Sequence, residues 1–254
     1  MSLLIMTGVE IANVTKEYYV GGHTFCALRN VSLTISPGSF TIIVGKSGCG
    51  KTTLLRLLAG LEEKTAGKVG SNDSGITQQG SRIGIVFQEH RLMPWLTVRE
   101  NMSFSLVQKN DQWKVKSVVD RYLSILGLEQ FQDAYPVQLS GGMAQRVALG
   151  RTLCYNPDII LMDEPFGALD YFTRKKMQQE IVDLFLLQQK TIIFVTHDVT
   201  EAVYLGQNII VMDAGEVVRE VPVGLPYHRN PVSPEFLAIQ SEILYSLGAN
   251  QFGV

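Results

Sequence analysis

The stretch GKSGCGKTT, residues 45–53, decides the fold, because glycines, a lysine and hydroxyl groups stand in it in a fixed order. Four of its residues satisfy the pattern G-x-x-x-x-G-K-[ST], namely Gly45, Gly50, Lys51 and Thr52. An apolar run precedes the stretch and the segment TTLLRLLAG follows, which predicts a strand, a loop and a helix. Glycines let consecutive backbone N–H groups turn toward an anion at the start of a helix. The sequence therefore predicts a phosphate-binding loop, which we call the phosphate loop.

The two lysines of the phosphate loop have different expected roles. The pattern places Lys51 at the β- and γ-phosphates of a nucleotide and the hydroxyl of Thr52 on Mg²⁺. Lys46 stands at the first variable position, and we interpret it as a solvated charge, with a contact to a second subunit as the alternative. Cys49 lies near a helix N-terminus and a lysine, which predicts a lowered pKa and a reactive thiol that nucleotide protects.

Short, nearly unbroken apolar runs recur along the chain, at residues 40–44, 83–87, 159–162, 192–195 and 209–212. Runs of this kind are typical of strands buried on both faces of a parallel sheet flanked by helices. After Asp170, apolar residues at helical spacing predict an amphipathic helix, with Met177, Ile181, Leu184 and either Leu187 or Gln188 on one face.

The first forty residues differ, since β-rich segments are separated there by Gly21-Gly22 and Pro37-Gly38, as in an antiparallel hairpin region. Helical patterns occur around residues 98–106 and 113–126. We predict one α/β domain over residues 1–254. It has a P-loop NTPase core with a mainly parallel sheet, an N-terminal antiparallel β layer and an α-helical subdomain inserted over roughly residues 89–157.

The composition excludes several classes of protein. With 46% hydrophobic and 18% charged residues, disorder and coiled coil are poor interpretations, and a net charge of −2 argues against a dedicated nucleic-acid binder. The three cysteines show no metal or disulfide spacing, which fits a reducing compartment. The apolar runs are too short to span a membrane and the N-terminus lacks the basic segment of a signal peptide. We expect a cytosolic chain unless a partner holds it at a membrane.

A second chemical motif is IILMDEP, residues 159–165, an expected buried strand that ends in Asp163 and Glu164. Side chains alternate along a strand, so adjacent acids point to opposite sides and are expected to do different jobs. One can hold a metal-bound water while the other orients the attacking water. Standing alone, the motif would be interpreted as two solvated acids at a strand end.

A third motif, LSGGMAQRVALGRTL, begins at residue 139. Ser140, Gly141 and Gly142 open an expected helix, which places a second anion-binding N-terminus in the chain. On this helix Met143, Val147, Gly150 and Cys154 share a face. A single nucleotide does not need both the phosphate loop and this second anion-binding helix N-terminus from the same chain.

With these three motifs in this order, the sequence resembles the ATP-binding subunit of an ABC transporter over essentially its whole length. The resemblance implies that two copies pack head to tail, so that each ATP lies between the phosphate loop of one copy and the LSGGM signature of the other. It also implies that ATP and Mg²⁺ are the cofactors. Position 143 is Met where Gln is usual, and position 46 is Lys where Pro or a small polar residue is common.

The resemblance implies roles for individual residues. Catalytic roles fall on Lys51, Gln88, Glu164 and His197, with Glu164 as the general base and His197 contacting the γ-phosphate. Mg²⁺ would be held by Thr52, Gln88 and Asp163. The residues implied to contact nucleotide are Tyr18, Gly45, Lys46, Ser47, Gly48, Cys49, Gly50, Lys51, Thr52, Thr53, Ser140, Gly141, Gly142 and Asp170. Among these, Tyr18 is expected to stack on adenine, with Tyr19 as the alternative, and Asp170 follows Ala168 and Leu169 in a loop that crosses the dimer interface.

The segment FQEHRLMPWLTVREN resembles importers of the nitrate, sulfonate and taurine group. The resemblance implies integral membrane permease subunits and a second copy of the chain as partners, with an extracytoplasmic solute-binding protein acting indirectly and no nucleic acid. It implies a location in the cytoplasm, peripheral on the inner face of the cell membrane. The chain ends soon after NIIVMDAGEVV, so we expect no added regulatory domain.

Two other functions stay open at this point. One is a soluble ABC ATPase that acts on DNA or ribosomes, although such relatives carry two cassettes or a long coiled-coil insertion. The other is a nucleotide-dependent regulatory module whose hydrolysis is incidental.

Overall fold

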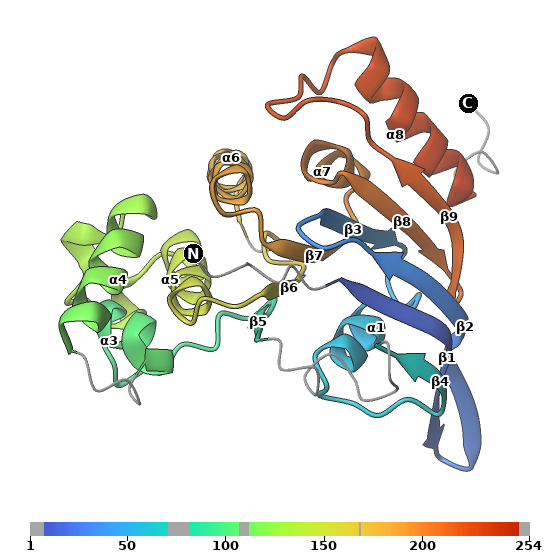
Figure 1. Ribbon diagram of the computed structural model, residues 1–254, viewed down its shortest axis with the longest axis horizontal. Coiled ribbons are helices and arrows are strands. Elements are labelled where there is room, and N and C mark those ends of the chain that lie inside the picture. Colours follow the sequence, from blue (N-terminus) through green and yellow to red (C-terminus); the bar gives the residue numbers. More distant parts are fainter. Residues whose placement is uncertain (1–7, 71–81, 107–111, 168, 249–254) are drawn as a thin grey trace.

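The computed structural model describes residues 8–70, 82–106, 112–167 and 169–248 (Figure 1). Its strands are β1 (Val9–Val20), β2 (His23–Ile35), β3 (Phe40–Gly45), β4 (Ala66–Val69), β5 (Ile83–Val86), β6 (Ile159–Asp163), β7 (Thr191–Thr196), β8 (Asn208–Asp213) and β9 (Glu216–Pro222). Its α-helices are α1 (Lys51–Leu58), α3 (Val98–Ser103), α4 (Gln112–Ile125), α5 (Gly141–Cys154), α6 (Tyr171–Gln188), α7 (Val199–Leu205) and α8 (Pro234–Ser246). Short 3₁₀ turns are η1 (Phe104–Leu106), η2 (Glu129–Phe131) and η3 (Pro136–Gln138).

The main sheet has the strand order β5-β6-β7-β3-β8-β9. The first five strands are parallel, and β9 runs antiparallel to β8. Every strand predicted from an apolar run is present. Because parallel strands end at the same edge, the segments that follow β3, β5, β6 and β7 all meet at one edge of the sheet.

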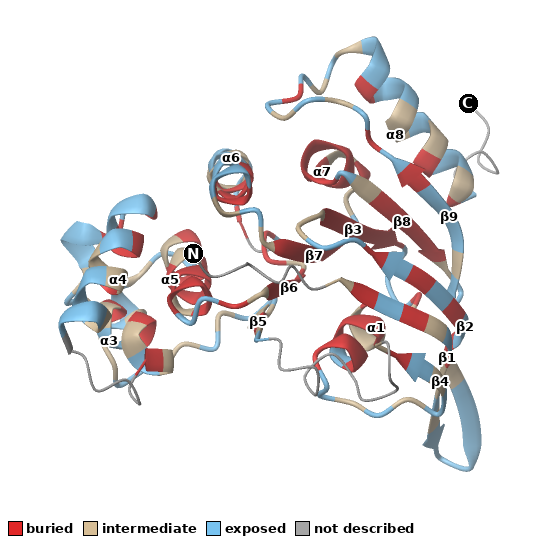
Figure 2. Ribbon diagram, in the orientation of Figure 1, coloured by how far each residue is buried: buried red, intermediate tan, exposed pale blue. Residues whose placement is uncertain are grey.

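Both faces of the main sheet are covered, which is why its strands read as continuous apolar runs (Figure 2). Ile42 and Val44 point into a core shared with α6, α7 and α8, whereas Ile43 between them points into a second core with α1 and the N-terminal strands. The same alternation separates Ile160 from Leu161 in β6. The prediction of a doubly covered parallel sheet is confirmed.

The N-terminal layer is an antiparallel sheet of order β2-β1-β4 (Figure 1). The turn between β1 and β2 is made by Gly21 and Gly22, whose φ angles are 58° and 83°. Positive φ is strained for residues with a side chain, so the glycine pair marks this turn in the sequence. The hairpin was predicted correctly, and it places Tyr18 near the phosphate loop.

The α-helical subdomain is built from α3, α4 and α5 and lies beyond the β5 and β6 end of the main sheet (Figure 1). A capping box begins α3, in which the Thr97 side chain accepts from the backbone of Glu100 and the Glu100 carboxylate accepts from the backbone of Thr97. The predicted helical segments 98–106 and 113–126 correspond to α3 with η1 and to α4. Most of α5 is buried between the other helices and β5.

The predicted face of α6 is confirmed for three residues, and of the two alternatives for the fourth position Gln188 is half-buried whereas Leu187 is exposed. Met177, Ile181 and Leu184 are buried as expected, but the side chain of Leu187 is 66% exposed. Phe185 is buried instead, with its ring centroid 5.4 Å from that of Phe40. The spacing of apolar residues along a helix does not show which edge of its apolar face packs against the sheet, so the neighbouring strand decides it.

None of the helices in the described part of the chain combines the length and the apolar character that a membrane span requires.

Candidate functional site

The phosphate loop connects β3 to α1, and its shape requires glycine. Gly48 and Gly50 have φ angles of 79° and 103°. A Cβ atom on Gly50 would lie 2.5 Å from the carbonyl oxygen of Ala27, far inside van der Waals contact. Gly50 is also the N-cap of α1, where a glycine leaves the first N–H groups of the helix open to an anion.

The two lysines of the loop lie in opposite environments. Lys51 is 4% exposed, and its Nζ donates to the carbonyl oxygens of Gly45 at 2.7 Å and Lys46 at 2.8 Å. The ammonium group therefore lies inside the curl of the loop. The side chain of Lys46 is exposed at the rim. The exposed Lys46 and the enclosed Lys51 agree with the different environments expected for the two lysines, and the contact of Lys51 with phosphate stays a prediction.

A cleft of about 470 Å³ opens beside the phosphate loop. It is lined by Tyr18, Phe25, Ala27, Ser47, Gly48, Gly50, Lys51, Thr52, Thr53, Gln88 and Glu164. The fold thus brings residues from β1, the phosphate loop, the end of β5 and the end of β6 to one site. The Tyr18 hydroxyl donates to the carboxylate of Glu62, and burial together with this carboxylate raises the pKa of Tyr18.

Phe25 is a cleft residue that sequence reasoning missed. Its side chain is 59% exposed, and it is the cross-strand partner of Tyr18 in the β1–β2 hairpin. The signal was available, since counting outward from the glycine turn pairs these two aromatic residues. Two aromatic side chains on one hairpin provide a broader surface for a planar base than Tyr18 alone.

The adjacent acids at the end of β6 point to different partners. Asp163 is 9% exposed, and its Oδ1 accepts a hydrogen bond from the Thr52 hydroxyl at 3.2 Å. Burial raises the pKa of Asp163, the hydrogen bond from Thr52 opposes the shift, and the charge of Glu164 adds to it. Glu164 has a φ of 43°, so the backbone turns sharply at this residue. The two acids therefore have different partners, as expected, although Glu164 lies beyond the end of β6 and their separate roles stay a prediction.

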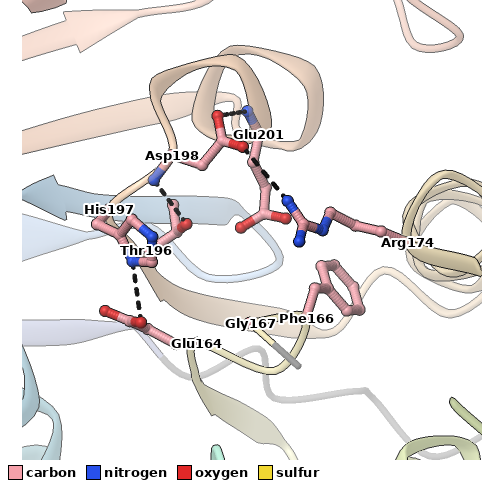
Figure 3. Close-up of a pocket in the computed structure, with 8 residues that line it drawn as sticks. All are labelled: Glu164, Phe166, Gly167, Arg174, Thr196, His197, Asp198 and Glu201. Atoms are coloured by element: carbon pink, nitrogen blue, oxygen red, sulfur yellow. Dashed lines mark hydrogen bonds and ion pairs between the residues drawn. The ribbon is translucent and has the colours of Figure 1, made fainter. Parts of the chain in front are cut away.

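Glu164 lies against His197, which follows β7. Nδ1 of His197 and Oε2 of Glu164 are 2.9 Å apart, a hydrogen-bonding distance (Figure 3). A small cavity of about 50 Å³ adjoins the pair. Its lining residues are Glu164, Phe166, Gly167, Arg174, Thr196, His197, Asp198 and Glu201. His197 does not line the larger cleft, but Glu164 lines both spaces and joins the two parts of the site.

The donors beside the phosphate loop suit Mg²⁺. A hydroxyl from Thr52, a carboxylate from Asp163 and an amide from Gln88 are hard ligands, and Mg²⁺ commonly binds to one or two carboxylates together with substrate phosphates. Within the described part of the chain, no group of three or more His, Cys, Asp and Glu side chains forms a metal cage of its own. These three residues fit an ion that phosphates help to hold.

The LSGGM signature lies outside the cleft of the phosphate loop. Ser140 is the N-cap of α5, and its hydroxyl accepts from the backbone N–H of Met143 at 3.3 Å. A Cβ on Gly141 would meet nothing within 4 Å, whereas a Cβ on Gly142 would lie 2.6 Å from Cγ2 of Thr173. Neither glycine nor Ser140 lines the cleft of the phosphate loop. The second helix N-terminus is therefore open on the surface, away from this chain's own nucleotide cleft.

Asp170 has a structural role that the sequence did not reveal. Its Oδ1 accepts from the backbone N–H groups of Phe172 and Thr173, both at 3.1 Å, so it caps α6. Hydrogen bonds from the side chain and then the backbone of Thr173, with a smaller one from the backbone of Phe172, lower the pKa of Asp170. Asp170 does not line the cleft, and Ala168, named with it above, lies outside the described residues.

The prediction for Cys49 is wrong. The side chain is 5% exposed, and burial raises the pKa of the thiol even though the charge of Lys51 opposes this shift. The sulfur faces inward, since a Cβ on Gly45 would lie 2.6 Å from it. Desolvation of the buried thiolate therefore outweighs the nearby cation, even though Nζ of Lys51 lies 3.9 Å from the sulfur.

A glycine-rich loop between a parallel strand and a helix, with a buried and a half-buried acid at the end of another strand of the same sheet, defines a P-loop nucleotide-binding protein. Residues 28–167 match the family model described as ABC transporter, and the chain belongs to this family. It is an ABC-type ATP-binding subunit and an ATPase.

The chain is similar to several curated proteins of this family. It is 43% identical over 238 residues to the aliphatic sulfonates import ATP-binding protein SsuB of Bacillus subtilis, which covers 93% of this chain and 92% of that protein. It is also 43% identical over 242 residues to an uncharacterized ABC transporter ATP-binding protein of Methanocaldococcus jannaschii, covering 93% and 90% of the two chains.

Solved structures share the fold. A dimeric structure of the ATP-binding cassette MJ0796 in a post-hydrolysis state, bound to ADP and Pi, aligns with a TM-score of 0.76 at 37% identity and covers 86% of this chain and all of that one. CbiO1 of Clostridium perfringens aligns with a TM-score of 0.77 at 24% identity, covering 96% of this chain and 95% of that one. Cassettes of this family act as dimers with membrane permease partners.

Proposed function

We propose that this chain powers the import of a small anion, such as a sulfonate, taurine or nitrate, through ATP-driven closure of a dimer. The observation that carries the proposal is the contact between Glu164 and His197 at the sheet edge that also holds the phosphate loop. The FQEHRLMPW segment and the similarity to an aliphatic sulfonates import protein support the substrate class.

Hydrolysis in this site rests on positioning and charge. Lys51 neutralises the β- and γ-phosphates from inside the phosphate loop, and Glu164 accepts a hydrogen bond from the attacking water and polarises it. His197 stabilises the charge that develops on the γ-phosphate. Thr52, Asp163 and Gln88 would hold Mg²⁺, which supplies positive charge to the same phosphates.

A second copy of the chain completes the site. The open N-terminus of α5, at Ser140 and Gly141, can face a nucleotide only in another molecule, because it lies away from this chain's own cleft. ATP held between two chains closes the dimer, and loss of the γ-phosphate opens it. The dimer binds permease subunits on the inner face of the cell membrane, and an extracytoplasmic solute-binding protein delivers the anion to that permease.

The experiment is a transport assay with defined parts. The chain is produced with the permease encoded beside its gene, reconstituted in vesicles, and assayed for ATP hydrolysis with each candidate anion and its binding protein. We expect co-purification of the permease and stimulation of hydrolysis by one class of anion. A Lys51→Ala variant serves as the control. Normal hydrolysis without any association with a permease would overturn the importer function while leaving the ATPase intact.

A further inference from the structure

We infer that Arg174 is a positioning residue that sets the geometry of the Glu164–His197 pair, an inference that rests on the proposed roles of those two residues. Arg174 lies in the first turns of α6, and its side chain reaches back to the small cavity next to the pair (Figure 3). It does not line the cleft of the phosphate loop.

The first contact of Arg174 is with the loop between β6 and α6. Its Nη2 donates to the carbonyl oxygen of Leu169 at 3.0 Å. This loop is a tight one, since the N–H of Gly167 donates to the carbonyl of Glu164 at 3.2 Å and the N–H of Leu169 donates to that of Phe166 at 3.1 Å. Arg174 therefore holds the far end of the loop that begins at Glu164.

The second contact is with the loop between β7 and α7. Nη1 of Arg174 lies 3.9 Å from Oδ2 of Asp198, the residue that follows His197. The other carboxylate oxygen of Asp198 caps α7 by accepting from the N–H groups of Thr200 at 2.8 Å and Glu201 at 3.1 Å. Asp198 thus uses one oxygen to fix its own helix and presents the other to Arg174.

A second carboxylate, that of Glu201, also lies near the positive charge of Arg174. Glu201 is 5% exposed, and its Oε1 accepts from Nε2 of Gln178 at 2.9 Å. Burial raises the pKa of Glu201, and the hydrogen bonds from Thr196 and Gln178 and the charge of Arg174 oppose that shift. Figure 3 shows the guanidinium group of Arg174 directed toward Asp198 and Glu201. Removing this cation leaves two carboxylates behind His197 without their shared counter-charge.

These contacts join the two catalytic loops at a second point. Glu164 and His197 meet at the near end, and Leu169 and Asp198 are bridged by Arg174 at the far end. A planar guanidinium has donors for both loops at once, which a lysine ammonium on a flexible stem does not reproduce. Loss of the bridge should loosen the near contact and slow the chemical step, with little effect on ATP binding.

The test uses five variants of the full chain: Arg174→Ala, Arg174→Lys, Asp198→Asn, the Arg174→Ala/Asp198→Asn double variant and Lys176→Ala. Lys176 is a matched control, because it is a cation on the same helix with a side chain that is 68% exposed. Asn keeps the α7 cap at position 198 but loses the charge. The readouts are kcat for ATP hydrolysis, the equilibrium dissociation constant for MgATP, and the melting temperature.

For Arg174→Ala we expect kcat to fall roughly 10- to 100-fold, as for a misplaced catalytic group, with the MgATP dissociation constant close to that of the wild type. Arg174→Lys and Asp198→Asn should each fall between that value and the wild type. The double variant should be no slower than Arg174→Ala, because both changes break one bridge. Lys176→Ala should match the wild type.

Normal kcat in Arg174→Ala, an equal loss in Lys176→Ala, or a loss explained by weaker ATP binding would each overturn the inference. Should Arg174→Ala fail to fold, wild-type kcat in both Arg174→Lys and Asp198→Asn would overturn it as well. A Glu164→Gln variant distinguishes a failure of the proposed role of Glu164 from a failure of the proposed role of Arg174. If it keeps full turnover, the proposed role of Glu164 fails. If it is inactive while Arg174→Ala is normal, only the role of Arg174 fails.

Discussion

Oε2 of Glu164 lies 2.9 Å from Nδ1 of His197, although the two residues are 33 positions apart in the chain. They meet because β6 and β7 are adjacent and parallel, so that the residues directly after both strands emerge at the same edge. Glu164 also lines the cleft of the phosphate loop, so the pair connects the nucleotide cleft to the loop that holds His197.

The first prediction concerns this carboxylate. Glu164→Gln keeps the size of the side chain and removes the base, so steady-state ATP hydrolysis should fall at least ~10²-fold while MgATP binding is retained. The variant should also dimerise when ATP is added, as measured by light scattering with size-exclusion chromatography. Glu129→Gln, in η2, is the control and should behave like the wild type. Turnover close to wild type in Glu164→Gln would exclude this residue as the base.

The second prediction separates the two lysines of the phosphate loop. Lys51→Ala removes the buried ammonium group and should abolish tight ATP binding, because no other cation of the loop lies inside its curl. Lys46→Ala removes only an exposed charge and should leave ATP affinity and dimerisation unchanged. Both are measured by titration with MgATP. Weaker dimerisation of Lys46→Ala at normal ATP affinity would instead indicate a contact of Lys46 with the second chain.

The third prediction uses the adjacent glycines of the signature as a matched pair. A methyl group on Gly141 meets open space, so Gly141→Ala should melt at the wild-type temperature. A methyl group on Gly142 meets Thr173 of α6, so Gly142→Ala should lower the melting temperature.

A measurement of ATP hydrolysis by the same variants then tests whether the N-terminus of α5 contacts a nucleotide. In Gly141→Ala the added methyl group should obstruct a nucleotide held by another copy, so ATP hydrolysis should fall although the monomer is intact. Full hydrolysis in a normally folded Gly141→Ala variant would argue against a nucleotide at this surface.

The fourth prediction concerns the thiol of Cys49. Burial raises its pKa above the ordinary value, so the thiolate, which is the reactive form, is scarcer near neutral pH than in a free cysteine. Alkylation should therefore be slower than for a cysteine in a short peptide, and the rate should keep rising as the pH increases through that ordinary value. Site-resolved mass spectrometry of iodoacetamide labelling measures both rates. Labelling of Cys49 as fast as the peptide at pH 7 would contradict the buried position.

Much of the site could be predicted because its signals are local. The phosphate loop depends on glycines at positions where the backbone turns with positive φ, and this requirement is written in consecutive residues. The different partners of Asp163 and Glu164 were expected from strand alternation, but β6 ends at Asp163, and the turn at Glu164, where φ is 43°, sets the direction of the second acid. The five parallel strands follow from continuous apolar runs, since only strands covered on both faces are apolar throughout.

The remaining features depend on which segments meet, and no local pattern reports this. Cys49 is buried in the core that contains α1 and the N-terminal strands, and that burial reverses the pKa shift expected from its sequence neighbours. The side of α6 that meets Phe40 decides that Phe185 rather than Leu187 is buried.

The sequence by itself determined the phosphate loop, the positions of the buried strands along the chain and the two acids that follow one of them, because these depend on backbone sterics and on continuous apolar runs. The tertiary structure alone decided that Arg174 bridges Leu169 and Asp198. Desolvation and hydrogen-bond partners are set by groups distant in the chain, and these two effects fix the charge state and orientation of a side chain.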